Sequence, residues 1–143
     1  LYHLRPNLFS KIINSKNIKE LKSYFENVKT SEFWENHFTF EKSSEEKTEK
    51  FLSDDFIEIL LINAVLPIIY TYYKNLNPEK TEQILEWYKN LKTEKNSIIS
   101  QWKKRGVKMQ SALETQAFLF HYKHYCSEKK CLNCSIGFQI LKS

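Results

Sequence analysis

The fold is decided by one apolar stretch near the middle of the chain. It reads Phe56-Ile57-Glu58-Ile59-Leu60-Leu61-Ile62-Asn63-Ala64-Val65-Leu66. Its apolar side chains point to nearly all sides of a helix, and a helix of that kind is usually surrounded by other helices. Pro67 follows at once, and proline lacks a backbone N–H and crowds the preceding turn. The stretch therefore predicts a central apolar helix that is kinked near Pro67.

Shorter helices with recognisable starts flank this stretch on both sides. Asn17, Asn77 and Ser111 stand where a side chain can cap a helix, and Gly106 can supply a left-handed stop. We expect a helical turn and then extended chain over 31–40, and over 41–50 a loop or the frayed start of the next helix. We expect helices over 6–14, 18–28, 94–105 and 132–141, a central helix that starts at 53–55, a helix that starts at 77–79 and includes Leu91, and a helix that follows Ser111 and includes Tyr125. The pattern predicts an all-α fold, a single irregular helical bundle of six or seven helices, with residues 1–143 as one domain.

The composition excludes several other classes of protein. The chain has 143 residues, of which 41% are hydrophobic and only two are glycine. A β-sandwich or barrel needs many tight turns, which rely on glycine, asparagine and aspartate. Gly-rich phosphate loops and dinucleotide fingerprints need several glycines close together. The sequence thus favours a globular helical protein without a nucleotide loop of either kind.

The ends and the apolar stretch bear on where the protein resides. The chain begins at Leu1, its only methionine is Met109, and no signal-peptide pattern is visible. We therefore expect a fragment of a longer protein, located in the cytoplasm. Glu58 and Asn63 interrupt the apolar stretch, whereas a membrane span needs about 20 largely uncharged residues. We expect a buried core helix and no membrane partner.

All three cysteines lie within nine positions near the C-terminus. Cys126, Cys131 and Cys134 form a Cys-x4-Cys-x2-Cys pattern, and His121 lies just upstream. Three thiolates and one imidazole would complete a tetrahedral zinc site. Three cysteines could also hold part of an iron–sulfur cluster. The simpler alternative is three reduced thiols in a corner between helices, because disulfides are rare in the cytosol.

A cluster of basic residues suggests a second kind of site. The formal net charge is +5, and the densest basic segment is Trp102-Lys103-Lys104-Arg105 with Lys108 beyond it. Such a segment could contact the phosphates of a nucleic acid while the ring stacks on a base. The simpler alternative is that the cations complement the negative end of a helix and that Trp102 belongs to the core.

No residue is predicted to be catalytic. His37 lies near aromatic residues, where a single histidine is more often a structural residue than a base. Asp54 and Asp55 are neighbours on a helix, so their side chains point apart, and a position in the first helical turn explains them. We do not expect this fragment to be an enzyme by itself.

Several segments resemble a known family. They are Leu1-Tyr2-His3-Leu4-Arg5-Pro6-Asn7-Leu8-Phe9-Ser10-Lys11-Ile12-Ile13, Asp55-Phe56-Ile57 through Asn63 and Pro67, Glu94-Lys95-Asn96-Ser97-Ile98-Ile99, Ser111-Ala112-Leu113-Glu114-Thr115-Gln116-Ala117, and Tyr125-Cys126 through Lys130-Cys131-Leu132, Cys134 and Ile136-Gly137. The chain resembles the C-terminal part of an uncharacterised family of large bacterial proteins, found mainly in the Bacteroidetes. That family is a domain of unknown function, so the resemblance implies a placement and no mechanism.

Two functions are compatible with these patterns. The first is a helical binding or scaffolding module of a larger cytoplasmic bacterial protein, whose partner is the rest of its own longer chain or another protein. The alternative is a metal-stabilised nucleic-acid-binding module, accessory to a nucleic-acid enzyme. The first rests on the rich core pattern, and the alternative rests on the basic segment and the cysteines.

Overall fold

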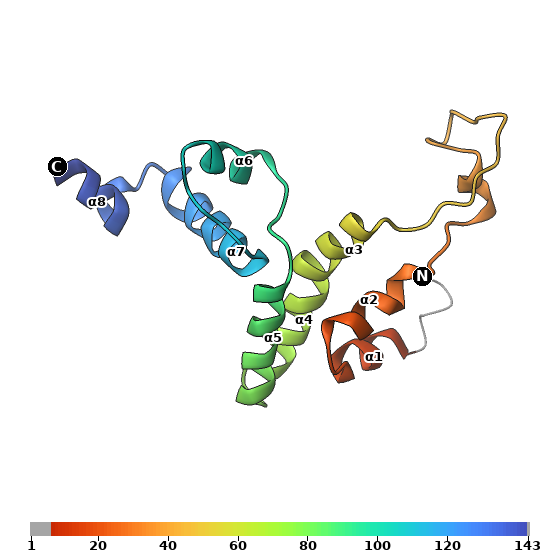
Figure 1. Cartoon of the computed structure of the whole chain (residues 1–143), viewed down its shortest axis with the longest axis horizontal. Helices are drawn as coiled ribbons and strands as arrows, with labels where there is room; N and C mark the ends of the chain where they lie inside the picture. The colour runs from red at the N-terminus through yellow and green to blue at the C-terminus, as the bar shows by residue number, and fades with distance from the viewer. Residues whose placement is uncertain (1–6, 143) are drawn as a thin grey trace. The chain divides into compact units, whose positions relative to one another are not determined.

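The structure is a computed structural model that describes residues 7–142 (Figure 1). These residues form eight α-helices, two of which join into one continuous helix, and no strand, which confirms the all-α prediction. The chain divides into two compact units after Trp87, within helix α5 (Pro78–Asn90). The first unit holds α1 (Leu8–Asn14), α2 (Ile18–Glu26), α3 (Asp54–Leu60) and α4 (Leu66–Tyr73). The second holds α6 (Ser97–Lys104), α7 (Ala112–His121) and α8 (Ser135–Lys142). That the whole chain is one domain stays a prediction.

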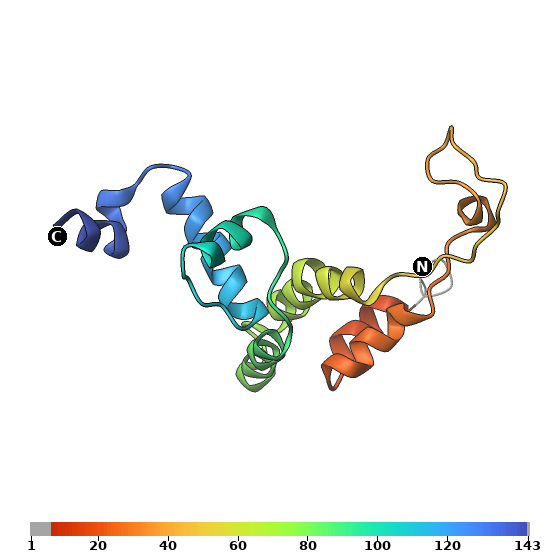
Figure 2. The ribbon, with the colours of Figure 1, turned by 45° about the horizontal axis from the view of Figure 1, so that its top comes forward.

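The central helix runs from Asp54 to Tyr73 and contains a widened turn. Helices α3 and α4 are joined by a π-helical turn, η3 (Leu61–Val65), and the ribbon continues through it (Figure 2). A π turn shifts the backbone hydrogen bonds by one residue, which is one way to accommodate a missing N–H and a bulky proline ring. The disturbance expected at Pro67 is therefore present, as a π turn directly before the proline.

The core of the first unit is built on this helix. Leu61, Leu66 and Ile69 are fully buried, and α2 contributes Leu21 and Phe25. Helix α2 is further tied to α3 by a Lys22–Glu58 ion pair of 2.6 Å. On the other side of the same unit, the Tyr73 hydroxyl donates to the Ile13 carbonyl at 3.1 Å. The apolar stretch thus organises the helices around it, as the sequence predicts.

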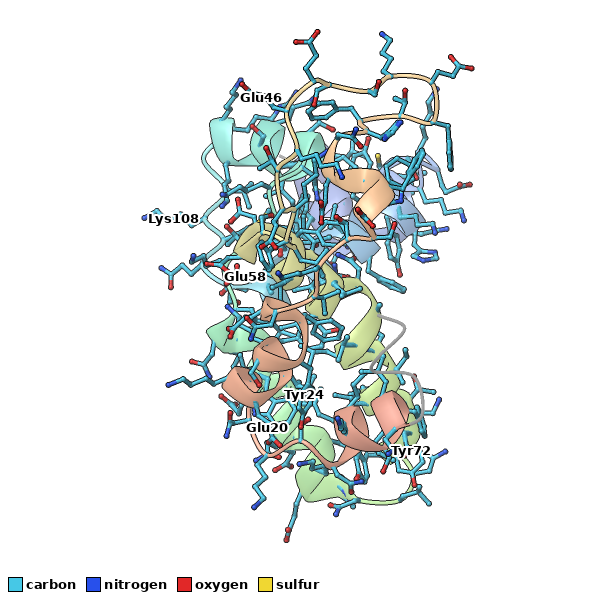
Figure 3. The ribbon with its side chains drawn as sticks, turned by 90° about the vertical axis from the view of Figure 1, so that its right-hand side faces the viewer. Glu20, Tyr24, Glu46, Glu58, Tyr72 and Lys108 are labelled. Atoms are coloured by element: carbon cyan, nitrogen blue, oxygen red, sulfur yellow. The ribbon has the colours of Figure 1, made fainter. Side chains whose placement is uncertain are left out.

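Helix α2 shows how local sequence sets a helix start. The Asn17 side chain accepts from the Glu20 N–H at 2.9 Å, and the Glu20 carboxylate accepts from the Lys16 N–H at 2.8 Å. The Tyr24 hydroxyl donates to the same carboxylate at 2.8 Å, and the two side chains lie together in Figure 3. These hydrogen bonds, with the Lys16 N–H first, lower the pKa of Glu20. The predicted cap is therefore present, although the helix ends at Glu26 instead of Val28.

Other helix boundaries follow the same chemistry. Ser53 caps α3 by accepting from the Phe56 N–H, and the Asn77 side chain accepts from the Lys80 N–H before α5. Helix α6 begins at Ser97, three residues later than predicted, because Asn96 is its cap. Gly106 adopts φ of 89° and ends that helix as expected. The predicted Pro6 start of the first helix lies outside the described residues.

The second unit packs α6 and α7 around a small core. Ile99, Ala112 and Thr115 are buried, and the Ala112 N–H donates to the Leu91 carbonyl at 2.9 Å. Helix α7 widens into a π turn, η4 (Tyr122–Cys126), and a short 3-10 turn, η5 (Cys131–Asn133), precedes α8. The last predicted helix, over 132–141, therefore begins three residues later, at Ser135.

Removing the cap of α7 should destabilise the second unit. Ser111 is buried, and its Oγ accepts from the Glu114 N–H at 3.3 Å. We expect Ser111→Ala to lower the free energy of unfolding by about 1 kcal/mol, because an N–H of the first turn loses its partner. Urea denaturation followed by circular dichroism measures the change. Ser100→Ala, at an exposed position of α6, is the control and should cause no loss; equal losses would contradict the capping role.

The central helix also bears on the membrane question. By length and composition alone, Asp54–Tyr73 is able to cross a membrane. The core helix of a soluble protein passes the same test, and Leu61, Leu66 and Ile69 are buried by neighbouring side chains. The absence of a membrane partner stays a prediction.

Candidate functional site

Residues 29–51 form a loop that we call the aromatic loop. It leaves the end of α2 and returns to the start of α3 (Figure 1). Two isolated antiparallel bridges, Lys29 with Phe51 and His37 with Ser43, bring its two sides together. Backbone hydrogen bonds from Thr30 to Lys50, from Ser44 to Asn36 and from Thr48 to Glu35, of 2.7–3.1 Å, tie them further. The sequence predicted part of this segment as extended chain; the structure shows a 3-10 turn (Glu32–Glu35) and a bridged loop.

Large aromatic side chains gather on the aromatic loop and face solvent. Phe38 is 73% exposed and Phe40 is 81% exposed. Phe40 contacts both Trp34 and Phe33, with ring centroids 5.1 and 6.1 Å apart. The Lys50 ammonium lies 4.0 Å from the centre of the Phe38 ring. Exposed aromatic side chains grouped on an ordered segment are typical of protein interaction sites.

His37 has a structural position within the same loop. Its ring stacks on Phe33 at a centroid distance of 4.0 Å. Its Nδ1 lies 2.7 Å from the Phe33 carbonyl oxygen and 2.9 Å from the Asn36 side-chain oxygen. An Nδ1–H would donate to these acceptors and fix the orientation of the ring. These contacts give His37 a part in shaping the loop.

The structure places the basic segment at the end of α6. Trp102 is half-buried, and its ring contacts Phe118 edge-on with centroids 5.0 Å apart. The Arg105 guanidinium lies 5.8 Å from the Trp102 ring, and the Lys103 ammonium donates to the Thr93 hydroxyl at 2.8 Å. Lys108 points away from the ribbon (Figure 3). Because Trp102 packs inside the unit, it is poorly placed to stack on a base.

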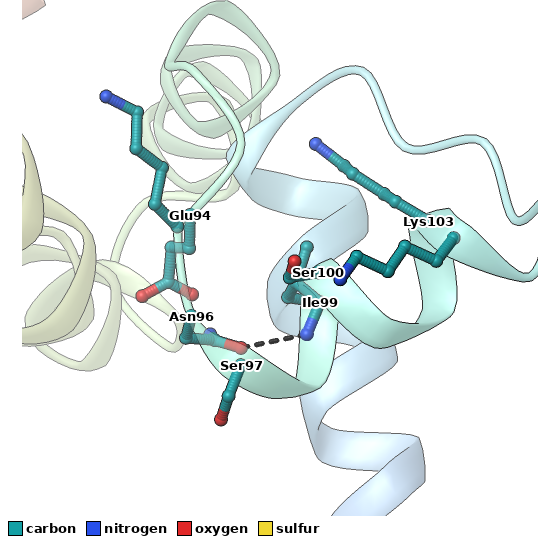
Figure 4. Close-up of a pocket in the computed structure, with 8 residues that line it drawn as sticks. Glu94, Asn96, Ser97, Ile99, Ser100 and Lys103 are labelled. Carbon is teal, nitrogen blue, oxygen red and sulfur yellow. Dashed lines mark hydrogen bonds between the residues drawn. The ribbon is translucent and has the colours of Figure 1, made fainter.

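A shallow cleft lies beside this segment, at the start of α6. It is lined by Glu94, Lys95, Asn96, Ser97, Ile99, Ser100, Lys103 and Lys104. Figure 4 shows the Asn96 side chain accepting from the Ile99 N–H, at 2.9 Å. Glu94 also accepts from the Gln116 amide at 2.6 Å. Asn96 therefore caps α6, and Glu94 joins the segment before α6 to α7.

The four predicted metal ligands lie in one corner of the second unit, residues 121–137, which we call the cysteine corner. Cys134 Sγ lies 3.3 Å from His121 Nε2 and is buried. Cys126 is half-buried, Cys131 is exposed, and all three thiols are free. Burial raises the pKa of the Cys126 thiol, and the nearby Cys134 and Cys131 add to the rise. Within residues 7–142, no three histidine, cysteine or carboxylate side chains converge on one metal position.

Backbone geometry brings these side chains into the corner. The Ser127 N–H donates to the Tyr122 carbonyl at 2.9 Å, which closes the π turn before the chain reverses. Lys129 adopts φ of 53° in the reversal. The Cys134 N–H then donates to the Cys131 carbonyl at 3.3 Å, and the Gly137 N–H donates to Cys134 Sγ at 3.5 Å. The structure thus pairs His121 with Cys134 and holds the other two thiols close by.

Gly137 allows the Cys131 backbone to approach α8. A Cβ at position 137 would lie 2.6 Å from the Cys131 carbonyl oxygen, closer than atoms can approach. We expect Gly137→Ala to push the Cys131–Asn133 turn away and destabilise α8 by about 1–3 kcal/mol. Amide hydrogen exchange over residues 135–142 measures the destabilisation of α8, and it should be faster in this variant. Gln139→Ala, at an exposed position of α8, should leave the exchange unchanged; the same acceleration in both variants would contradict the close approach.

The fold and these surfaces define an all-α protein that exposes an aromatic loop. The chain belongs to the family described as "Protein of unknown function (DUF2851)", whose model matches residues 1–97. The match includes the aromatic loop and the central helix, and the cysteine corner lies beyond it. No curated protein and no solved structure matches the chain. These findings confirm the resemblance to a domain of unknown function, and none of them favours nucleic-acid binding.

Sequence reasoning missed the aromatic loop as a site. The segment was predicted as a helical turn, extended chain and loop, without a surface of its own. The available signal was its density of rings, with Phe33, Trp34, Phe38, Phe40 and Phe51 within nineteen positions that otherwise look like a loop. Loops are usually polar, so such a concentration of rings outside a helix indicates an interaction surface.

Proposed function

We propose that this chain is a helical binding or scaffolding module of a larger cytoplasmic bacterial protein, and that the aromatic loop contacts a protein partner. The observation that carries the proposal is the exposure of Phe38 and Phe40 on an ordered loop. Rings held in place by backbone hydrogen bonds lose little conformational freedom on binding. Aromatic residues also dominate the energy of many protein interfaces.

The charge of the loop favours protein over nucleic acid as its partner. Residues 29–51 hold four lysines and six glutamates, a net charge of −2, whereas the whole chain carries +5. An acidic loop is repelled by phosphates, which dominate the affinity of proteins for nucleic acids. It is complementary to a protein surface with an apolar pocket and a basic rim, because opposite charges at an interface steer association. We therefore expect the partner to be a protein with an apolar pocket and a basic rim.

Site-specific photo-cross-linking tests this proposal. p-Benzoylphenylalanine is placed at position 40 and, as a matched control, at position 76, since Leu76 is also exposed (68%) but lies after α4 and outside the loop. After irradiation in cells of the source organism, we expect position 40 to yield a protein adduct that position 76 does not. Mass spectrometry should map the adduct to an apolar site flanked by lysine or arginine.

The same experiment separates the other outcomes. An adduct within a longer form of the same polypeptide or on another protein supports the proposal, provided that the site has the stated chemistry. An adduct with nucleic acid, equal adducts at both positions, or no adduct at position 40 would overturn it.

A further inference from the structure

We propose that His121, Cys126, Cys131 and Cys134 bind one zinc ion, and that this ion fastens α8 to the end of α7. The proposal stands on the arrangement of the four side chains in the cysteine corner. It is independent of the function proposed for the aromatic loop, which lies in the other unit.

The His121–Cys134 pair already has the spacing of two zinc ligands. Zinc binds a histidine nitrogen at about 2.05 Å and a thiolate at about 2.3 Å in a tetrahedral arrangement, so the two atoms lie about 3.6 Å apart. In this structure, Nε2 and Sγ are 3.3 Å apart. Cys134 is buried, so its sulfur is held in place by its surroundings. Half of a tetrahedral site is therefore preformed.

The remaining two ligands lie on the turns that flank this pair. Cys131 precedes Cys134 by three residues across a single 3-10 turn, and its side chain is exposed. Cys126 ends the π turn that begins directly after His121. The Cys131 backbone is already seated against α8 through Gly137. No three of these side chains converge on one metal position within residues 7–142, so zinc binding must draw Cys126 and Cys131 toward the His121–Cys134 pair.

Helix α8 needs such a fastening. It spans eight residues, none of them buried, and its main neighbour is the Cys131–Asn133 turn. Isolated helices shorter than about 12–15 residues are marginal in water. Ile136, Phe138, Ile140 and Leu141 are all exposed, so apolar burial within the chain does not hold this helix. A metal ion that joins one ligand before α8 to others at the end of α7 would supply the missing restraint.

The chemistry of the donor set favours zinc. Three thiolates and one neutral imidazole form a Cys3His set, which is a common structural zinc site. Binding releases the three thiol protons to solvent and leaves a site with one net negative charge, which balances Zn²⁺ against three thiolates. Nearby Lys129 and Lys130 lie in the reversal between the ligands and offset that charge.

Metal titration of the full 143-residue chain tests the proposal. The chain is purified with a reductant, mixed with zinc sulfate, desalted and analysed by elemental mass spectrometry. We expect one zinc per chain, and at least a 100-fold loss of affinity in Cys126→Ser, Cys131→Ser, Cys134→Ser and His121→Gln. His124→Gln is the matched control, because His124 lies on the same π turn but its ring contacts Phe120, and it should keep full affinity.

Two further readouts make the test decisive. Cobalt in place of zinc should show a thiolate charge-transfer band that weakens with each cysteine removed, because thiolates are its source. Zinc should slow amide exchange over residues 135–142 in the wild type and not in Cys131→Ser. Because Cys131 is exposed, that variant remains informative even if the buried Cys134→Ser does not fold. No zinc at equimolar metal, zinc retained by Cys131→Ser, equal loss in His124→Gln, or iron with acid-labile sulfide would each overturn the proposal.

Discussion

Ile69→Ala is expected to lower the free energy of unfolding of the first unit by about 2–5 kcal/mol. Ile69 lies in α4 with none of its surface exposed, so the substitution removes buried apolar atoms and leaves a cavity. A loss of this size is a large share of the 5–15 kcal/mol by which native proteins are typically stable. Equilibrium denaturation in urea, followed by circular dichroism, measures the difference.

The neighbouring isoleucine provides a matched control. Ile68 is 47% exposed, and surface substitutions usually change stability by less than about 0.5 kcal/mol. Ile68→Ala removes the same atoms one position earlier on the same helix. A loss as large as that of Ile69→Ala would mean that the central helix buries a different face. The comparison therefore tests how the π turn before Pro67 sets the orientation of α4.

Phe40→Ser is expected to weaken binding of the cross-linked partner by about 30-fold, which corresponds to about 2 kcal/mol. The ring is 81% exposed and contacts Trp34 and Phe33, so it offers a large apolar surface at the centre of the cluster. Titration of the purified partner by calorimetry gives the Kd of each variant. The variant should keep its helical circular dichroism, because Phe40 lies outside the core.

The control for this prediction is Leu76→Ser, which removes another strongly exposed apolar side chain (68%) elsewhere in the first unit. It should leave the Kd within about twofold of the wild type. Equal increases of the Kd in the two variants would mean that any exposed apolar side chain contributes to binding, whether or not it lies on the aromatic loop. An unchanged Kd for Phe40→Ser would remove the aromatic loop from the interface.

The helices could be predicted because their signals are local. Asn17 and Glu20, three residues apart, mark the start of α2. Asn17 makes the capping hydrogen bond that the spacing suggests, whereas the Glu20 carboxylate accepts from Lys16 N–H, one residue before the cap. The predicted start of α6, at Glu94, lies three residues too early, because the Asn96 side chain provides the actual cap. Pro67 predicted a break in the regular hydrogen bonding of the central helix. A proline alone, however, does not specify whether the helix bends or widens into a π turn.

The candidate sites were harder to predict because they depend on how separate segments meet. The sequence grouped the cysteines, but it could not single out His121 and Cys134 as the pair in contact. That pairing requires a chain reversal through Lys129 across thirteen residues. The aromatic loop depends on bridges between Lys29 and Phe51, which are twenty-two positions apart. Neither the reversal nor the bridges leave a periodic pattern that can be read along the chain.

Amide hydrogen exchange with and without the cross-linked partner tests whether the aromatic loop is the binding surface. We expect the partner to slow exchange within residues 29–51 and to leave exchange in the cleft over residues 94–104 unchanged. Because the loop backbone is already hydrogen-bonded, the protection should follow the exposed rings at Phe38 and Phe40. Protection of residues 94–104 in place of the loop, or no protection of either, would show that the loop does not bind the partner.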